Sequence, residues 1–94
     1  MKELSQIRLE LDDIDRQLVR LFEERMLLSR QVAQYKIAKG LPVLDAQRER
    51  QVIQSRRALL KDARWADGVE AVFETIMAQS RKEQEAMVKE AKAL

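Results

Sequence analysis

The chain of 94 residues is long enough for one domain but short for a self-sufficient hydrophobic core. Its 18 Lys and Arg and 16 Asp and Glu alternate along the sequence, and only 4% of residues are aromatic, which argues against a nucleic-acid partner. The absence of Cys and His excludes a thiol nucleophile, a disulfide, an imidazole base and a Cys/His metal site.

The apolar and acidic residues narrow the function further. No apolar run is long enough to cross a bilayer and the N-terminus lacks a signal-peptide core, so we expect a cytoplasmic protein without membrane contact. The carboxylates show no metal-ligand spacing, and we expect neither a metal nor a cofactor. Any reaction would have to depend on positioning and electrostatics.

A stripe of apolar residues at alternating steps of three and four predicts one long helix over about residues 4–38. The stripe consists of Leu4, Ile7, Leu11, Ile14, Leu18, Leu21, Leu28, Val32 and Tyr35. At about 1.5 Å per residue such a helix measures roughly 52 Å, which is far longer than a globule of this size. We therefore predict a homodimer in which the helix packs on its own copy.

Arg25 interrupts this stripe where another apolar residue is due. A guanidinium on a packing face either sets the register of the helices or is held for an anionic ligand, because its burial is costly without a partner. Ser29 and Lys36 fall on the same face as Arg25. Lys36 alone is also explained as a cation that complements the helix C-terminus.

Arg8 lies beside Ile7, at the edge of the stripe. A simple pair with Asp12, one turn on, would explain it. Arg8 and Arg25 are 17 residues apart, about 25 Å along the helix, so one small ligand cannot contact both within one subunit. If the two arginines cooperate, Arg8 comes from the other subunit.

Gly40 and Pro42 end the first helix, and Asp45 is a suitable N-cap for a second helix over about residues 46–60. Arg48 and Glu49 occupy its first turn and place a cation and a carboxylate beside the loop that leads back to Lys36. The alternative is an exposed ion pair, which is how most such clusters behave. We expect its apolar residues to form a modest inner face, made by Val52, Ile53, Leu59 and Leu60.

After a polar connection, Asp67 and Glu70 form a capping-box pattern that predicts a third helix over about residues 67–92. Its apolar stripe is made by Val69, Val72, Phe73, Ile76, Met77 and Met87. Ser80 and Gln84 take core positions of this stripe. The three predicted helices give an all-α fold. Because all three carry polar residues on or beside a packing face, we predict that they enclose a polar pocket, suited to a dicarboxylate with a hydroxyl group.

The ordered set of polar residues resembles the all-helical chorismate mutases that are fused to prephenate dehydratase in enteric bacteria. The matching residues are Arg8, Leu11-Asp12-Asp13-Ile14-Asp15, Glu24-Arg25, Val32, Lys36, Pro42-Val43, Asp45, Arg48-Glu49-Arg50, Phe73, Ile76, Ser80 and Gln84. The resemblance covers nearly the whole chain as one domain, residues 1–94. It implies an interlocked homodimer of three-helix subunits, whose two active sites each use both chains.

Carried over residue by residue, the resemblance also implies roles. Arg8 of one chain and Arg25 of the other would bind the two carboxylates of chorismate, with Ser80 assisting. Lys36 and Gln84 would donate to the ether oxygen. Glu49 and the backbone near Asp45 would take the ring hydroxyl, and Arg48 would line the carboxylate side of the pocket.

The implied reaction is the rearrangement of chorismate to prephenate, which needs no proton transfer and so agrees with a chain without His or Cys. Two other readings stay open. An isochorismate pyruvate lyase of the same fold has a similar pocket, and a non-catalytic helical dimerisation module would use the polar residues to set register. A longer chain that carries further domains is also compatible with the sequence.

Overall fold

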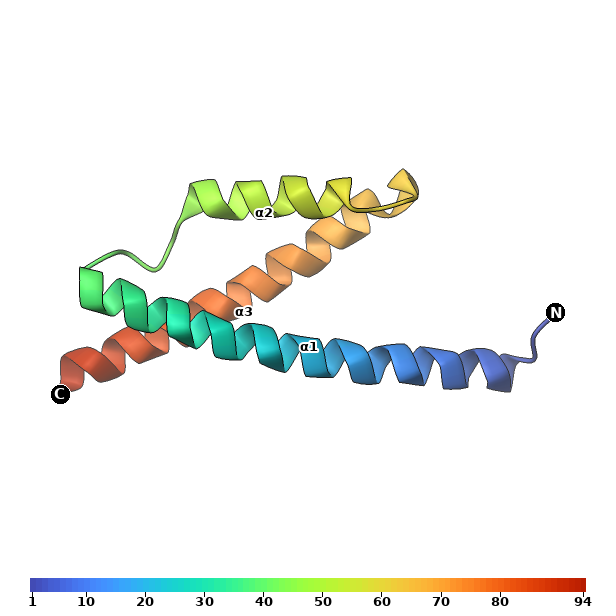
Figure 1. Ribbon diagram of the computed structural model, residues 1–94, viewed down its shortest axis with the longest axis horizontal. Coiled ribbons are helices and arrows are strands. Elements are labelled where there is room, and N and C mark those ends of the chain that lie inside the picture. The colour runs from blue at the N-terminus through green and yellow to red at the C-terminus, as the bar shows by residue number, and fades with distance from the viewer.

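A computed structural model describes residues 1–94 as three α-helices and one short 3-10 turn. Helix α1 covers Leu4–Lys39, α2 covers Ala46–Ala58, the turn η1 covers Ala63–Trp65, and α3 covers Ala66–Ala93. Figure 1 shows α3 crossing the C-terminal part of α1, with α2 on one side of the crossing, while the N-terminal part of α1 extends away from the other helices. The expected all-α fold, with a very long first helix and a short second one, is confirmed.

The length of α1 gives the chain its elongated shape. A helix of 36 residues spans about 54 Å, and the extents of the chain are 59 × 26 × 14 Å. Its radius of gyration is 16.9 Å, whereas a compact domain of this size would have about 12 Å. Only 7 of the 94 residues are buried, so the chain alone has a very small core.

This core lies where α1 and α3 cross. Ala33 of α1 is 1% exposed, and its small side chain lets α3 approach closely. Met77 and Met87 of α3 and Val52 of α2 complete the buried apolar set. Buried Ser29, Ser80 and Gln84 lie among these residues, so the crossing is polar as well as apolar.

The second helix begins as predicted and ends earlier than expected. The Asp45 carboxylate accepts a hydrogen bond from the backbone N–H of Arg48 at 3.0 Å, which makes it the N-cap. The helix stops at Ala58, and Leu59 is 78% exposed, so the expectation that Leu59 contributes to an inner face is wrong for the single chain.

The third helix begins without the predicted capping box. Its N-cap is Trp65, which makes no side-chain cap, and Asp67 already lies inside the first turn. The Asp67 and Glu70 carboxylates instead accept hydrogen bonds from Arg57 of α2. The pattern was misread because Arg57, which is distant in the sequence and lies on α2, binds both acids.

No helix combines the length and the apolar character that a membrane crossing requires.

Replacing glycine by alanine should have opposite effects on stability at the two glycines of the chain. Gly40 ends α1 with a φ of +66°, a left-handed conformation that a Cβ disfavours by about 1–2 kcal/mol. Gly68 lies inside α3, where nothing lies within 4 Å of an added Cβ and alanine has the better helix propensity by up to about 1 kcal/mol. We expect Gly40→Ala to lower the free energy of unfolding and Gly68→Ala to raise it, measured by urea unfolding at one protein concentration. A stabilising Gly40→Ala would contradict this account.

Candidate active site

A pocket of about 350 Å³ lies at the α1–α3 crossing and is closed on one side by α2, from its first turn to its last. Seven of the eight residues singled out in the sequence line it: Arg25, Lys36, Asp45, Arg48, Glu49, Ser80 and Gln84. Its charged lining comprises five cationic side chains, of Arg25, Lys36, Arg48, Arg56 and Arg81, and the two carboxylates of Asp45 and Glu49. The pocket is therefore suited to an anion.

Gln84 is one of the two best-buried polar residues of the site, at 7% exposure, the same as Ser29. Its amide nitrogen donates to the hydroxyl of Ser29 at 2.8 Å, and its amide oxygen accepts from the Lys36 ammonium at 3.4 Å. Lys36 also donates to the backbone oxygen of Val43 in the loop after α1. Lys36 thus does more than complement the end of α1: it joins this loop to α3 beside the pocket.

Arg25 lies half-buried between α1 and α3. Its guanidinium is within 3.5 Å of the Ser80 hydroxyl and lies 6.0 Å from the centre of the Phe73 ring. Burial, followed by the charges of Arg56 and Arg48, lowers the pKa of Arg25 from its ordinary value. The group remains charged at neutral pH, and an anion beside it would offset both effects.

The acids of α2 have different surroundings. Asp45 is held by its capping bond, whereas Glu49 forms an ion pair with Arg81 of α3. Arg48 donates to Gln51 on its own helix at 3.0 Å. The alternative of an exposed Arg48–Glu49 pair is therefore wrong, since Glu49 is engaged across helices.

Arg8 is the one predicted residue that the structure does not bring to this pocket. It is exposed, lies near the free end of α1, and makes no ion pair with Asp12. Within a single chain the helix keeps Arg8 and Arg25 apart, as its length requires.

The sequence analysis missed three groups that contribute to the pocket. Arg56 and Arg81 line the pocket, and the Val43 carbonyl accepts from Lys36. The sequence did hold one indication of their role, which is their position relative to predicted site residues. Arg81 directly follows Ser80, and Arg56 lies two helical turns beyond Arg48. Their long side chains lie on helix flanks, which sequence periodicity alone does not assign to a pocket.

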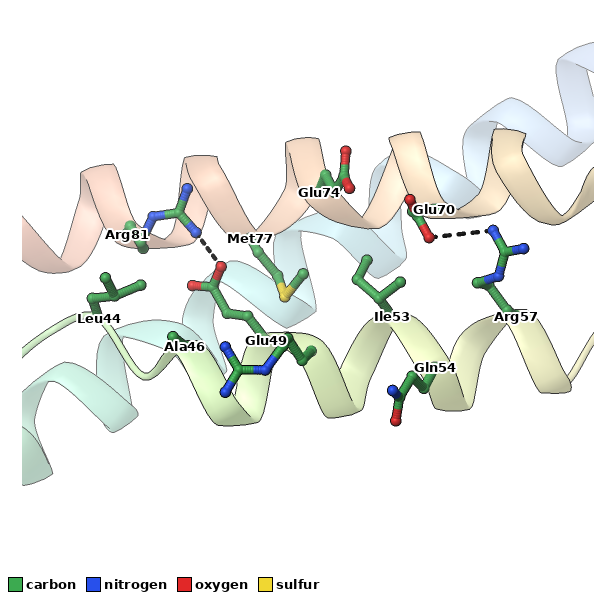
Figure 2. Close-up of a pocket in the computed structure, with 11 residues that line it drawn as sticks. Leu44, Ala46, Glu49, Ile53, Gln54, Arg57, Glu70, Glu74, Met77 and Arg81 are labelled. Carbon is green, nitrogen blue, oxygen red and sulfur yellow. Dashed lines mark hydrogen bonds and ion pairs between the residues drawn. The ribbon is translucent and has the colours of Figure 1, made fainter.

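A second hollow, of about 730 Å³, lies between α2 and α3 on the outer side of the same ion pair. Figure 2 shows Glu49 and Arg81 bonded to each other across this hollow, with Arg57 bonded to Glu70 farther along the two helices. Glu49 and Arg81 line both spaces, so this ion pair forms part of the wall between them. No group of three or more acidic, His or Cys side chains converges in the structure.

Comparison with known proteins identifies the family of the chain. The family model "Chorismate mutase type II" matches residues 7–85. The chain is 37% identical over 81 residues to the "T-protein" of Haemophilus influenzae, and 34% identical over 62 residues to the "Chorismate mutase" of Methanocaldococcus jannaschii. It is also 34% identical over 62 residues to the "Bifunctional chorismate mutase/prephenate dehydratase" of Aquifex aeolicus.

These alignments include 85%, 66% and 66% of the chain, in that order, but only 22%, 63% and 17% of the three relatives. The chain thus spans less than two thirds of each of these relatives. No solved structure matches it with significance. Since the family model extends over most of the three-helix fold and includes all the singled-out residues, the chain belongs to the chorismate mutase type II family.

Proposed function

We propose that the protein is a chorismate mutase, which converts chorismate to prephenate in the biosynthesis of phenylalanine and tyrosine. One observation carries the proposal: in a member of this family, the Lys36 ammonium lies 3.4 Å from the amide oxygen of Gln84 in a cationic pocket, and the amide nitrogen of Gln84 uses one N–H on Ser29. The Lys36 ammonium and the second N–H of Gln84 are thus hydrogen-bond donors on neighbouring side chains, where a developing negative charge can be stabilised. The assignment also fits the names of the relatives.

The breaking C–O bond defines the first part of the mechanism. An amide nitrogen has two N–H groups, and Ser29 accepts from the amide nitrogen of Gln84, which leaves the other N–H for the ether oxygen of chorismate. The Lys36 ammonium supplies a second donor to this oxygen. Both groups are oriented before the substrate enters, so little reorganisation is needed as charge builds up on the oxygen.

The remaining residues hold the substrate in its compact, chair-like conformation. Arg25, oriented beside Ser80, binds one carboxylate, and Arg8 of the second subunit binds the other, with Arg48 on the same side. Glu49, together with the backbone near Asp45, accepts the ring hydroxyl, and Arg81 orients the Glu49 carboxylate. Restricting the substrate to this reactive geometry lowers the barrier without any proton transfer.

A homodimer is part of this proposal. The apolar stripe of α1 is uncovered in the single chain, with Leu11 51%, Leu18 59% and Leu28 58% exposed. Such a continuous apolar face is typical of a protein interface. A second α1 packed on this stripe would cover it and bring Arg8 of the partner toward the pocket. A cytoplasmic location stays a prediction.

The first test is the loss of chorismate absorbance when purified protein is added, with the product identified. Prephenate would establish the proposed activity. Salicylate and pyruvate from isochorismate, with no prephenate from chorismate, would assign the lyase reaction instead. A folded dimer without either turnover would favour the dimerisation module.

Lys36→Ala is expected to lower kcat by at least about 10²–10³-fold, because one preorganised donor to the ether oxygen is lost. Lys39→Ala is the matched control, since Lys39 ends the same helix, lies outside this pocket and should leave turnover near that of the wild type. Steady-state kinetics together with circular dichroism separate loss of chemistry from loss of fold. Turnover by Lys36→Ala equal to that of Lys39→Ala would refute the role of Lys36.

Gln84→Glu should make the reaction depend on pH. An ionised Glu accepts hydrogen bonds only and would pair with Lys36, so activity at neutral pH should fall strongly. Acidification restores a proton to the new carboxyl group, and activity should rise as the pH decreases. The pH profile of kcat/KM, compared with that of the wild type, measures this. A variant profile parallel to the wild-type one would exclude contact between Gln84 and the ether oxygen.

A mixing experiment tests whether Arg8 acts on the other subunit's pocket. Arg8→Ala and Arg25→Ala should each be nearly inactive, yet a mixed dimer has one pocket with both arginines intact. With random exchange about half of the dimers are mixed, so we expect recovery of up to roughly a quarter of wild-type activity. Two Arg8→Ala preparations mixed together are the control. If the mixture of Arg8→Ala and Arg25→Ala is as inactive as the control although its subunits are shown to exchange, Arg8 does not act on the pocket of the other subunit.

A further inference from the structure

Arg56 of α2 lies at the Arg25 end of the pocket. Its guanidinium carbon is 5.8 Å from the centre of the Phe73 ring, and that of Arg25 is 6.0 Å from the same centre. Its Nη1 atom donates to the hydroxyl of Ser55 at 2.8 Å. One aromatic ring and one hydroxyl thus fix the position of a guanidinium that lines the pocket.

The arrangement places like charges together. Arg25 and Arg56 share one ring, and neither takes part in any of the seven ion pairs of the chain. Burial is the main cause of the lowered pKa of Arg25, and repulsion by Arg56 is the next. A bound anion would turn this repulsion into attraction, because both guanidinium groups could donate to it.

The paired guanidinium groups of Arg25 and Arg56 are suited to bind a carboxylate. A carboxylate has two oxygens and about four acceptor positions, more than one guanidinium fork occupies. We propose that Arg56 is a further substrate-binding residue. It shares with Arg25 the substrate carboxylate that is held at the Arg25 end of the pocket, beside Phe73. This inference rests on the proposed function, and it adds a fourth arginine to Arg25, Arg48 and the partner-derived Arg8.

The neighbouring residue offers a matched control. Arg57 lies in the same last turn of α2, but its guanidinium donates to Asp67 at 3.1 Å and to Glu70 at 3.2 Å. It lines the outer hollow, as Figure 2 shows, and it is not among the residues that line the pocket. Two adjacent arginines on one helix therefore differ in whether their charge is already neutralised.

The experiment compares the wild type with Arg56→Met and Arg57→Met. Calorimetry measures binding of a bicyclic dicarboxylate analogue of the transition state, chorismate kinetics give KM and kcat, and thermal unfolding gives Tm. We expect Arg56→Met to weaken binding of the analogue by about tenfold to a hundredfold, as the loss of a charge-assisted hydrogen bond does. Its Tm should be equal or higher, because repulsion of Arg25 is removed. Arg57→Met should bind within about twofold of the wild type, since its surface ion pairs lie outside the pocket.

A conservative variant separates binding from support of the fold. Arg56→Lys keeps the cation, so it should recover part of the affinity that Arg56→Met loses. Wild-type affinity in Arg56→Met would overturn the inference. An Arg56→Met variant that melts lower, or fails to fold, would also overturn it, because Arg56 would then act through structure.

The proposed function can fail independently of this inference. A wild-type protein that binds the analogue with the expected Arg56 dependence but does not convert chorismate would refute the mutase activity and leave the role of Arg56 intact. A wild-type protein that does not bind the analogue would overturn both.

Discussion

A helix of 36 residues in a chain of 94 cannot be covered by the residues that remain, and this constraint determines most of the structure. Helices α2 and α3 pack only around the C-terminal part of α1, where Ala33 allows a close crossing. The buried apolar side chains are therefore few, and polar groups make up much of the crossing. The polar residues of this crossing are those that line the pocket, so the small core and the site occupy the same place.

Polar groups can lie at the centre of so small a core because they are bonded to one another. Ser29, Gln84 and Lys36 form a continuous chain of hydrogen bonds from α1 to α3 and back to the loop after α1. No buried side-chain nitrogen or oxygen lacks a partner. A fully bonded network avoids the penalty of buried polar groups and also fixes their directions. The orientation of the Gln84 amide and the Lys36 ammonium is thus a consequence of folding.

The sequence was most informative where one residue type interrupts a regular pattern. Arg25, Ser80 and Gln84 occupy positions of apolar stripes, so periodicity alone placed them on packing faces, and Asp45 was recognised from the chemistry of helix capping. Arg56 and Arg81 were missed because they flank the stripes, and whether a flank faces a pocket depends on the crossing of two helices. The start of α3 was misjudged for a similar reason, since Asp67 and Glu70 are bonded by Arg57 from α2. Local sequence patterns were enough to predict local structure, whereas contacts between helices that are distant in the sequence could be identified only from the three-dimensional structure.

The ion pair between Glu49 and Arg81 separates two spaces of different character. On one side is the cationic pocket, and on the other the open hollow between α2 and α3. Glu49 and Arg81, together with Met77, line both spaces, so neither charged side chain can move without changing both surfaces. Reshaping the outer surface, by mutation or by a packed neighbour, would therefore also change the position of the Glu49 carboxylate on the pocket side. The shape of the outer hollow and the charged lining of the pocket are thus coupled through one ion pair.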